Sequence, residues 1–245
     1  MNNFSKNLVV NQQVTTSLGH SKQAASISKM WCIFAVGQDS VLELRALSPK
    51  GTKSPQPPKT KHFRVKDYST TGDCKAAFEV EALRLNELGY NVYVVMNPIR
   101  PDFNCAGSAT DADIRYRDLL LIDIDKTGVK KEPASADELE AARKLAETVK
   151  RYLEHRGLTE PFVMMSGNGY HLYYVLDDVQ NTEENTELIR KVLEELAEVF
   201  NNSVVSIDTG VYNASRITKV PGTIMRKGTE TVDRPYRMAE VCDAL

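Results

Sequence analysis

Short apolar runs alternate with two long amphipathic stretches in the second half of the chain. Apolar runs predict strands at residues 117–125, 162–165, 170–176 and 204–207. Ser135 and Glu138 form a capping-box pattern that predicts a helix to about residue 156, and a second helix is expected over residues 182–200. The order β-α-β-β-α-β is the ferredoxin-like arrangement, in which the third strand lies beside the first and the fourth pairs with its other edge.

The first half has a less regular pattern. It predicts strands at residues 31–36, 41–47, 62–65 and 91–96, and one helix over residues 73–88 that is capped by Asp73 and ended by Gly89. Four prolines make residues 48–60 a loop, and residues 97–113 are a second irregular loop. We therefore expect a polar, flexible arm over residues 1–29, an α/β half over 30–113 and the ferredoxin-like half over 114–245.

Composition narrows the class of protein. The chain has 245 residues, and its 31 Lys and Arg against 33 Asp and Glu exclude a polybasic coat but not a local basic patch. Apolar runs such as residues 119–122 are far too short to cross a membrane, and the first 20 residues lack the apolar stretch of a secretory signal. Four scattered cysteines without a CxxC pair favour a cytoplasmic protein without disulfides or structural zinc.

Two carboxylates on one strand carry the first chemical signal. Period-two alternation places Asp123 and Asp125 on the same face as Arg117, Leu119 and Leu121. Adjacent carboxylates repel each other and are costly to bury unless a cation lies between them, and oxygen ligands select Mg²⁺ or Mn²⁺. A DxD pattern alone is weak evidence. Asp208 strengthens it, because this residue ends the strand that is expected to pair with the DxD strand. Three carboxylates around two metal ions would suit nucleotidyl or phosphoryl transfer.

A glycine-rich turn follows the next strand. Residues 166–171 read SGNGYH, so that Gly167 and Gly169 allow a close approach of the backbone to a ligand, with Asn168 between them. The hydroxyl of Ser166 and the ring of His171 can donate to phosphate oxygens. The alternative is a plain hairpin turn with a histidine packed in the core.

A basic segment follows Asp208. Residues 209–238 hold six Lys and Arg and two acids, a local net charge of +4. Arg216 and Lys219 are close enough in sequence to bind one polyphosphate, and Arg226 and Lys227 can bind phosphates of a nucleotide or a template. A solvated basic loop is the alternative.

These motifs resemble a known family. LLLIDID, SGNGYHLYY and SIDTGVYNASRITKVPGT are similar to the three motifs of the archaeo-eukaryotic primase superfamily, in particular the primase-polymerases of plasmids, phages and other mobile elements. The resemblance spans about residues 30–240. It implies an α+β fold in which an RRM-like (ferredoxin-like βαββαβ) catalytic half packs with an N-terminal α/β half. The implied activity is template-directed nucleotidyl transfer from dNTPs or NTPs to a 3′-hydroxyl, with primer synthesis on single-stranded DNA.

The resemblance also implies roles for residues and partners. Asp123, Asp125 and Asp208 would bind two Mg²⁺ or Mn²⁺ ions. Template and primer DNA would be the macromolecular substrates, and a replicative helicase or other mobile-element proteins would be further partners. Asn97, Arg45 and Arg117 are weaker candidates for the site. The residues expected to contact the incoming nucleotide are Ser166, Gly167, Asn168, His171, Arg216 and Lys219.

Two other classes of protein remain open. LLLIDIDKT also fits the DxDxT motif of phosphatases of the haloacid dehalogenase type, in which Asp123 would be the nucleophile and Asp177 and Asp178 the distal acidic pair. A non-catalytic RRM-like module would instead bind single-stranded nucleic acid on exposed aromatic side chains, for which Tyr173 is available on the same face as His171.

Overall fold

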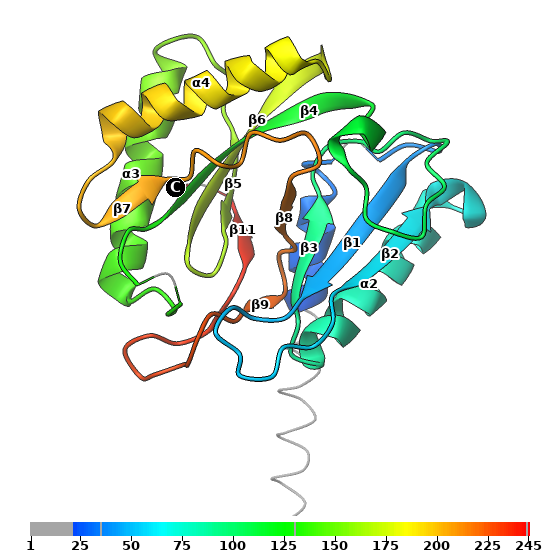
Figure 1. Ribbon diagram of the computed structural model, residues 1–245, viewed down its shortest axis with the longest axis horizontal. Helices are drawn as coiled ribbons and strands as arrows, with labels where there is room; N and C mark the ends of the chain where they lie inside the picture. Colours follow the sequence, from blue (N-terminus) through cyan, green and yellow to red (C-terminus); the bar gives the residue numbers. More distant parts are fainter. Residues whose placement is uncertain (1–21, 35, 130, 244) are drawn as a thin grey trace, which may run out of the picture.

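The computed structural model describes residues 22–34, 36–129, 131–243 and 245, which form two antiparallel sheets with helices packed against them (Figure 1). The fold is of the α+β class, as predicted. The first sheet has the order β2 (Lys59–Arg64), β1 (Val41–Leu47), β3 (Asn91–Val95), β8 (Ile217–Lys219). The second sheet has the order β11 (Glu240–Cys242), β5 (Phe162–Met165), β6 (Gly169–Gln180), β4 (Tyr116–Lys126), β7 (Val205–Ile207). The remaining elements are the β9 (Ile224–Met225) and β10 (Arg237–Met238) ribbon, helices α2 (Thr71–Glu87), α3 (Ala136–Glu154) and α4 (Glu183–Phe200), and short 3₁₀ helices at Val65–Asp67 and Asp111–Asp113.

The second sheet confirms the predicted ferredoxin-like order. β4 pairs with β6 on one side and with β7 on the other, and β5 pairs with the far edge of β6. Helices α3 and α4 lie on one side of this sheet, and the first sheet lies on the other side (Figure 1). The polar residues of the inner face of β4 and β6 are therefore enclosed between two sheets.

The helices of this half form for the reasons that the sequence indicates. The Ser135 side chain accepts from the Glu138 N–H at 3.2 Å, and Glu138 Oε2 accepts from the Ser135 N–H at 2.8 Å, which completes the predicted capping box. Gly157 ends this stretch with a φ of +87°, a conformation that glycine adopts without strain. The buried stripe of α3 is Ala142, Leu145, Ala146, Val149 and Leu153.

The N-terminal region differs from the prediction. Residues 22–30 are helical, and residues 31–34, which were predicted to be a strand, form a turn. Ile27 and Met30 are almost completely buried, and the Trp31 ring lies 5.1 Å from the ring of Phe78. The prediction of a flexible arm is therefore wrong for residues 22–29, because three apolar side chains at helical spacing pack into the core. Residues 1–21 of the predicted arm lie outside the described residues.

Helix α2 also begins earlier than predicted. Thr70, and not Asp73, is its N-cap, because the Thr70 hydroxyl accepts from the Asp73 N–H at 3.1 Å. Phe78 and Leu85 are buried as expected, whereas Leu88 is 50% exposed and does not belong to the core. Gly89, with a φ of +90°, ends the helix as predicted.

The C-terminal segment joins both sheets. β8 pairs with β3 of the first sheet, and β11 extends the edge of the second sheet by pairing with β5. The predicted boundary between residues 113 and 114 thus does not separate the two sheets, because the basic segment crosses back to the N-terminal half. Among the described helices, none is long and apolar enough to cross a membrane.

Candidate active site

A cavity of about 320 Å³ lies between the two sheets. Strands β4 and β6, the turn before β6, the loop after β7, and strands β3, β8 and β9 all contribute to its wall. Of the residues singled out from the sequence, those that line this cavity are Asp123, Asp125, Ser166, Asn168, His171, Asp208, Arg216, Lys219, Arg226 and Lys227. The structure therefore brings together side chains that lie up to 104 positions apart in sequence.

Gly167 is the predicted site residue that does not line the cavity. Its φ is +101°, and a Cβ added to it would lie 2.5 Å from Met225 Cβ, so this glycine is required by the turn and by the approach of β9. Gly169 has a different role: an added Cβ would lie 2.0 Å from the Ile124 carbonyl oxygen and 2.9 Å from Asp125 Oδ1. The glycines of the turn thus allow β4, β6 and β9 to pack closely.

An imidazole and an ammonium group lie beside the carboxylates. Asp123 lies directly across from His171, with 3.4 Å between His171 Nε2 and Asp123 Oδ1. Lys227, from the segment after β9, places its Nζ 3.2 Å from Asp125 Oδ2. The other oxygen of Asp125, Oδ1, is buried and has no hydrogen-bond partner among the described residues. An unpartnered carboxylate oxygen in a polar cavity is a position where a cation would bind favourably.

Electrostatics drives the pKa values of the two carboxylates apart. Burial raises the pKa of Asp125, and the neighbouring charge of Asp123 raises it further, while Lys227 opposes both effects. Burial also disfavours the charged form of Asp123, but the charges of His171, Lys227 and Arg216 outweigh burial and lower the pKa of Asp123. Burial, and to a smaller extent the charges of these two carboxylates, raise the pKa of the Tyr93 phenol at the cavity wall to about 12.

Asp208 lies at the same cavity on a neighbouring strand end, as predicted. Its backbone N–H donates to the Asp123 carbonyl oxygen at 2.8 Å, and its exposed carboxylate accepts from the Gly210 N–H at 2.8 Å. Among the described residues, no three His, Cys, Asp or Glu side chains are gathered closely enough to hold a metal ion. The Asp123 and Asp125 pair, with its oxygen-only donors and one unpartnered oxygen, fits Mg²⁺ or Mn²⁺. Asp208 would complete the set only if its side chain turns away from Gly210.

A buried network fixes His171. Its Nδ1 lies 2.9 Å from the Tyr173 hydroxyl and 3.2 Å from Thr218 Oγ1, and these two hydroxyls are 2.5 Å apart. Tyr173 is 1% exposed, and burial raises its pKa, so it remains a neutral phenol. The network directs Nε2 of His171 toward Asp123 and the cavity. It also removes Tyr173 as an exposed stacking platform, which was the feature that the RRM-like binding module required.

The cavity is rich in cationic side chains. Lys219 is 2% exposed, donates to the Ile224 carbonyl at 3.2 Å and lies over the Tyr93 ring; burial, followed by the charge of Arg226, lowers its pKa well below the ordinary value. Among the described residues, Arg226 has one buried nitrogen without a partner, and so does Arg216, which otherwise donates to the Gly210 carbonyl. The basic residues that line the cavity are Lys50, Arg216, Lys219, Arg226 and Lys227, against three carboxylates. An anionic ligand would satisfy this excess of positive charge.

Polar donors also point to a ligand at the turn before β6. Asn168 is 3% exposed; its Oδ1 accepts from the Ala134 N–H at 2.8 Å, but its Nδ2 is buried without a partner among the described residues. Ser166 is 8% exposed and its backbone N–H closes the turn with the Gly169 carbonyl at 2.9 Å. The Asn168 amide is therefore a donor in need of an acceptor at the cavity wall.

The three weaker candidates have structural roles outside this cavity. Asn97 accepts from the N–H groups of Asp118 and Leu119 and donates to the Ala214 carbonyl. Arg45 pairs with buried Glu43 and donates to the Ala109 carbonyl, and buried Arg117 donates to the Tyr212 carbonyl and to Thr186. Each of these side chains fixes a loop.

Sequence reasoning missed Lys50, Asn91, Tyr93 and Thr218, which also line the cavity. Lys50 was assigned to a solvated loop, and Asn91 and Tyr93 to a strand of the other half. Alternation along residues 91–96 places Asn91 and Tyr93 on one face, but only the pairing of β3 with β8 shows that this face borders the carboxylates.

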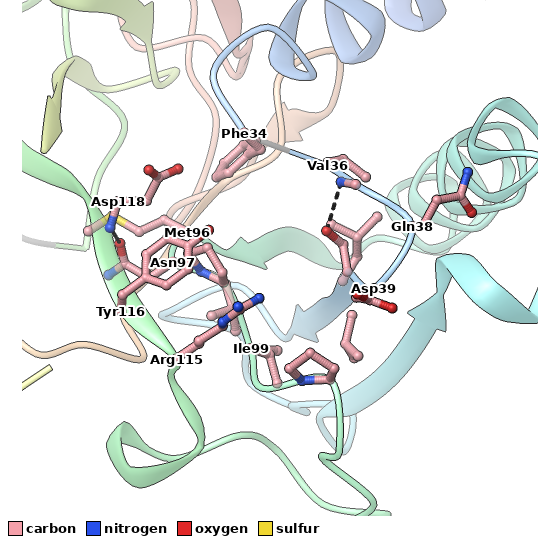
Figure 2. A pocket seen from close by; sticks show the side chains of 17 residues that line it. Phe34, Val36, Gln38, Asp39, Met96, Asn97, Ile99, Arg115, Tyr116 and Asp118 are labelled. Carbon is pink, nitrogen blue, oxygen red and sulfur yellow. Dashed lines mark hydrogen bonds between the residues drawn. The ribbon is translucent and has the colours of Figure 1, made fainter. Parts of the chain in front are cut away.

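A second cavity of about 220 Å³ lies at the opposite ends of β1 and β3 (Figure 2). Its wall mixes apolar and polar side chains, with Phe34, Leu42 and Met96 buried beneath it, and its charged residues are Asp39, Arg115 and Asp118. It shares no lining residue with the first cavity and lacks a paired set of carboxylates.

The acidic pair of the phosphatase alternative lies away from the site. Gly169 is the partner of Asp125 at one end of the β4 and β6 ladder, whereas Gln180 is the partner of Tyr116 at the other end. Asp177 and Asp178 are exposed near that second end and do not line the cavity. The structure therefore contradicts the arrangement in which this pair would assist Asp123.

Comparisons with known proteins give a likeness of fold. No family model matches the chain, and no curated protein matches it. The catalytic domain of primase Repb′, solved in complex with initiator DNA, matches with a TM-score of 0.47 and 12% identity over 91% of this chain and 85% of that chain. The polymerase domain of Mycobacterium tuberculosis Ligase D, solved in complex with DNA, matches with a TM-score of 0.47 and 18% identity over 89% of this chain and 80% of that chain.

Proposed function

We propose that this protein is a DNA primase-polymerase, a nucleotidyltransferase that adds nucleotides from dNTPs or NTPs to a 3′-hydroxyl on a single-stranded DNA template. One observation carries the proposal. The Asp123 and Asp125 pair, which has a buried oxygen without a partner among the described residues, lies beside His171 in a cavity lined by five basic side chains. Nucleotidyl transfer requires carboxylates that bind divalent ions and, beside them, cations that bind a polyphosphate.

Asp123 and Asp125, joined by Asp208, would hold Mg²⁺ or Mn²⁺. When bound, these ions would lower the pKa of the attacking 3′-hydroxyl and neutralise charge on the pyrophosphate leaving group. Burial and mutual repulsion make the carboxylate pair costly without a cation, which supports this assignment.

The chain's own donors would bind and orient the triphosphate. His171 Nε2 is already fixed at the cavity, and Ser166 and the Asn168 amide lie on the adjoining turn. Arg216 and Lys219 reach the cavity from the loop after β7 and from β8. Their preorganised charges would stabilise negative charge that develops on the phosphates during transfer, without reorganisation of solvent.

Template and primer DNA are the proposed macromolecular substrates. A helicase partner remains an expectation that rests on the motif resemblance. De novo primer synthesis needs a second nucleotide to supply the first 3′-hydroxyl, so extension and initiation are separate activities of the proposed enzyme.

The test is extension of a labelled primer on a single-stranded template with dNTPs and Mn²⁺ or Mg²⁺. The wild type is expected to extend the primer, and the Asp123→Ala, Asp125→Ala double variant is expected to lose extension. The matched control is the Asp177→Ala, Asp178→Ala double variant, which removes two carboxylates at the far end of β6 and is expected to retain extension. Equal activity of wild type and the Asp123, Asp125 variant would refute the proposal, and so would hydrolysis of a small phosphate ester without any extension.

A further inference from the structure

The two basic side chains that contact the carboxylate pair differ in how firmly they are held. His171 belongs to β6, and its ring is fixed by the hydroxyls of Tyr173 and Thr218. Lys227 follows β9 and reaches Asp125 with an ammonium at the end of a flexible four-carbon chain. Of the two, Lys227 is the side chain that can move away from its carboxylate.

The backbone on each side of Lys227 is anchored. The Arg226 N–H donates to Asn91 Oδ1 at 2.8 Å, and Asn91 Nδ2 donates to the Arg226 carbonyl at 2.7 Å. The Gly228 N–H donates to the Lys50 carbonyl at 2.9 Å. The main chain at Lys227 is thus fixed at the cavity wall. Rotation about the side-chain bonds of Lys227 can therefore move its ammonium without a change in the main chain.

Lys227 occupies an oxygen that a divalent ion would need. Its Nζ lies 3.2 Å from Asp125 Oδ2, its side chain is 13% exposed, and among the described residues Asp125 is its only side-chain partner. An ammonium and a divalent ion on the same carboxylate would repel each other strongly in a partly buried cavity.

We propose that Lys227 is an internal counter-ion that exchanges partners: it pairs with Asp125 until a divalent ion binds, and it then pairs with the phosphates of the nucleotide. This inference rests on the proposed function, which places both ligands in this cavity. The exchange couples the two ligands. A nucleotide offers Lys227 a new partner and so raises the affinity for the ion, and the ion raises the affinity for the nucleotide by the same factor.

The test is direct measurement of Mn²⁺ binding to the full chain by electron paramagnetic resonance at pH 8. Titrations are run with and without a non-hydrolysable dNTP, and Mn²⁺ bound by the nucleotide alone is measured separately. Without nucleotide, Lys227→Met is expected to bind Mn²⁺ about tenfold more tightly than wild type, because a competing charge is removed. The nucleotide is expected to tighten Mn²⁺ binding less in this variant than in wild type.

Further variants separate the charge from packing. Lys227→Gln is expected to behave like Lys227→Met, and Lys227→Arg, which retains the charge, like wild type. Lys131→Met removes a lysine outside the cavity and is expected to keep the wild-type affinity. Thermal melting by circular dichroism establishes that each variant is folded.

The outcomes distinguish this inference from the proposed function. If folded Lys227→Met and Lys227→Gln bind Mn²⁺ no more tightly than wild type does, the partner exchange is overturned. In that case the proposed function still stands, provided that wild type binds Mn²⁺ saturably and Asp123→Ala abolishes this binding. If wild type shows no Mn²⁺ binding that depends on Asp123, the proposed metal site itself fails, and the inference fails with it.

Discussion

A single methyl group added at Gly169 is expected to disrupt the packing of β4 against β6. A Cβ added there would lie 2.0 Å from the Ile124 carbonyl oxygen, whereas carbon and oxygen atoms in contact are normally about 3.3 Å apart. Relief requires a movement of more than about 1 Å between β4 and β6. β4 is held by β6 on one side and by β7 on the other, so it cannot yield without breaking hydrogen bonds.

We therefore expect Gly169→Ala to lower the free energy of unfolding by about 3 kcal/mol, at the upper end of the usual cost of overpacking. The same methyl group would lie 2.9 Å from Asp125 Oδ1, so primer extension should fall as well. The assay is urea denaturation followed by circular dichroism. Gly72→Ala is the matched control. It lies in the first turn of α2, where the nearest contact is an ordinary 3.5 Å, and is expected to raise stability by about 0.5 to 1 kcal/mol. If Gly169→Ala changed stability by no more than the control does, the close packing of β4 on β6 described above would be wrong.

Two further predictions concern the buried network and the buried amine. Tyr173→Phe removes the hydroxyl that orients His171 and is expected to lower kcat/KM for primer extension about fivefold to tenfold, the value of roughly one hydrogen bond. Tyr174→Phe removes a buried hydroxyl that has no partner among the described residues, and it should leave kcat/KM unchanged. Equal effects of the two substitutions would contradict the positioning role of Tyr173. Because the pKa of Lys219 is lowered in the folded protein, the unfolded chain binds the Lys219 proton more tightly than the folded protein does. This residue therefore lowers the free energy of unfolding increasingly as pH falls from the ordinary lysine pKa of 10.5 toward the lower pKa of Lys219 in the folded state. In urea denaturation with a chelator present, Lys219→Met is expected to be more stable than wild type by about 1 to 2 kcal/mol at pH 7. This difference in the free energy of unfolding should become smaller toward pH 10. A difference that is constant with pH would show that packing, and not charge, is responsible.

Much of the second half of the fold can be predicted from the sequence because its signals are local. The capping box at Ser135 and Glu138 fixes where α3 begins, and strand alternation places Asp123 and Asp125 on the inner face of β4. The order of strands β7, β4, β6 and β5 follows from the handedness of the two crossovers. Co-location of the three aspartates and His171 at one cavity then follows from the sheet.

The features that the sequence does not predict depend on long-range contacts. The helix over residues 22–30 has a serine-rich sequence, and only burial of Ile27 and Met30 against the core reveals its stable face. The pairing of β8 with β3 joins segments more than 120 residues apart and brings Tyr93 to the cavity. Lys227 reads as one basic residue among several until its ion pair with Asp125 is seen.

The central claim is that Asp123 and Asp125 hold divalent ions beside a bound triphosphate. An anomalous difference map from a crystal of the protein grown with Mn²⁺ and a non-hydrolysable dNTP tests it most directly. The account predicts Mn²⁺ peaks in contact with Asp123 and Asp125, with the phosphates within hydrogen-bond distance of His171 and Arg216. Peaks remote from these carboxylates, or a nucleotide bound in the second cavity near Arg115 and Asp118, would contradict it.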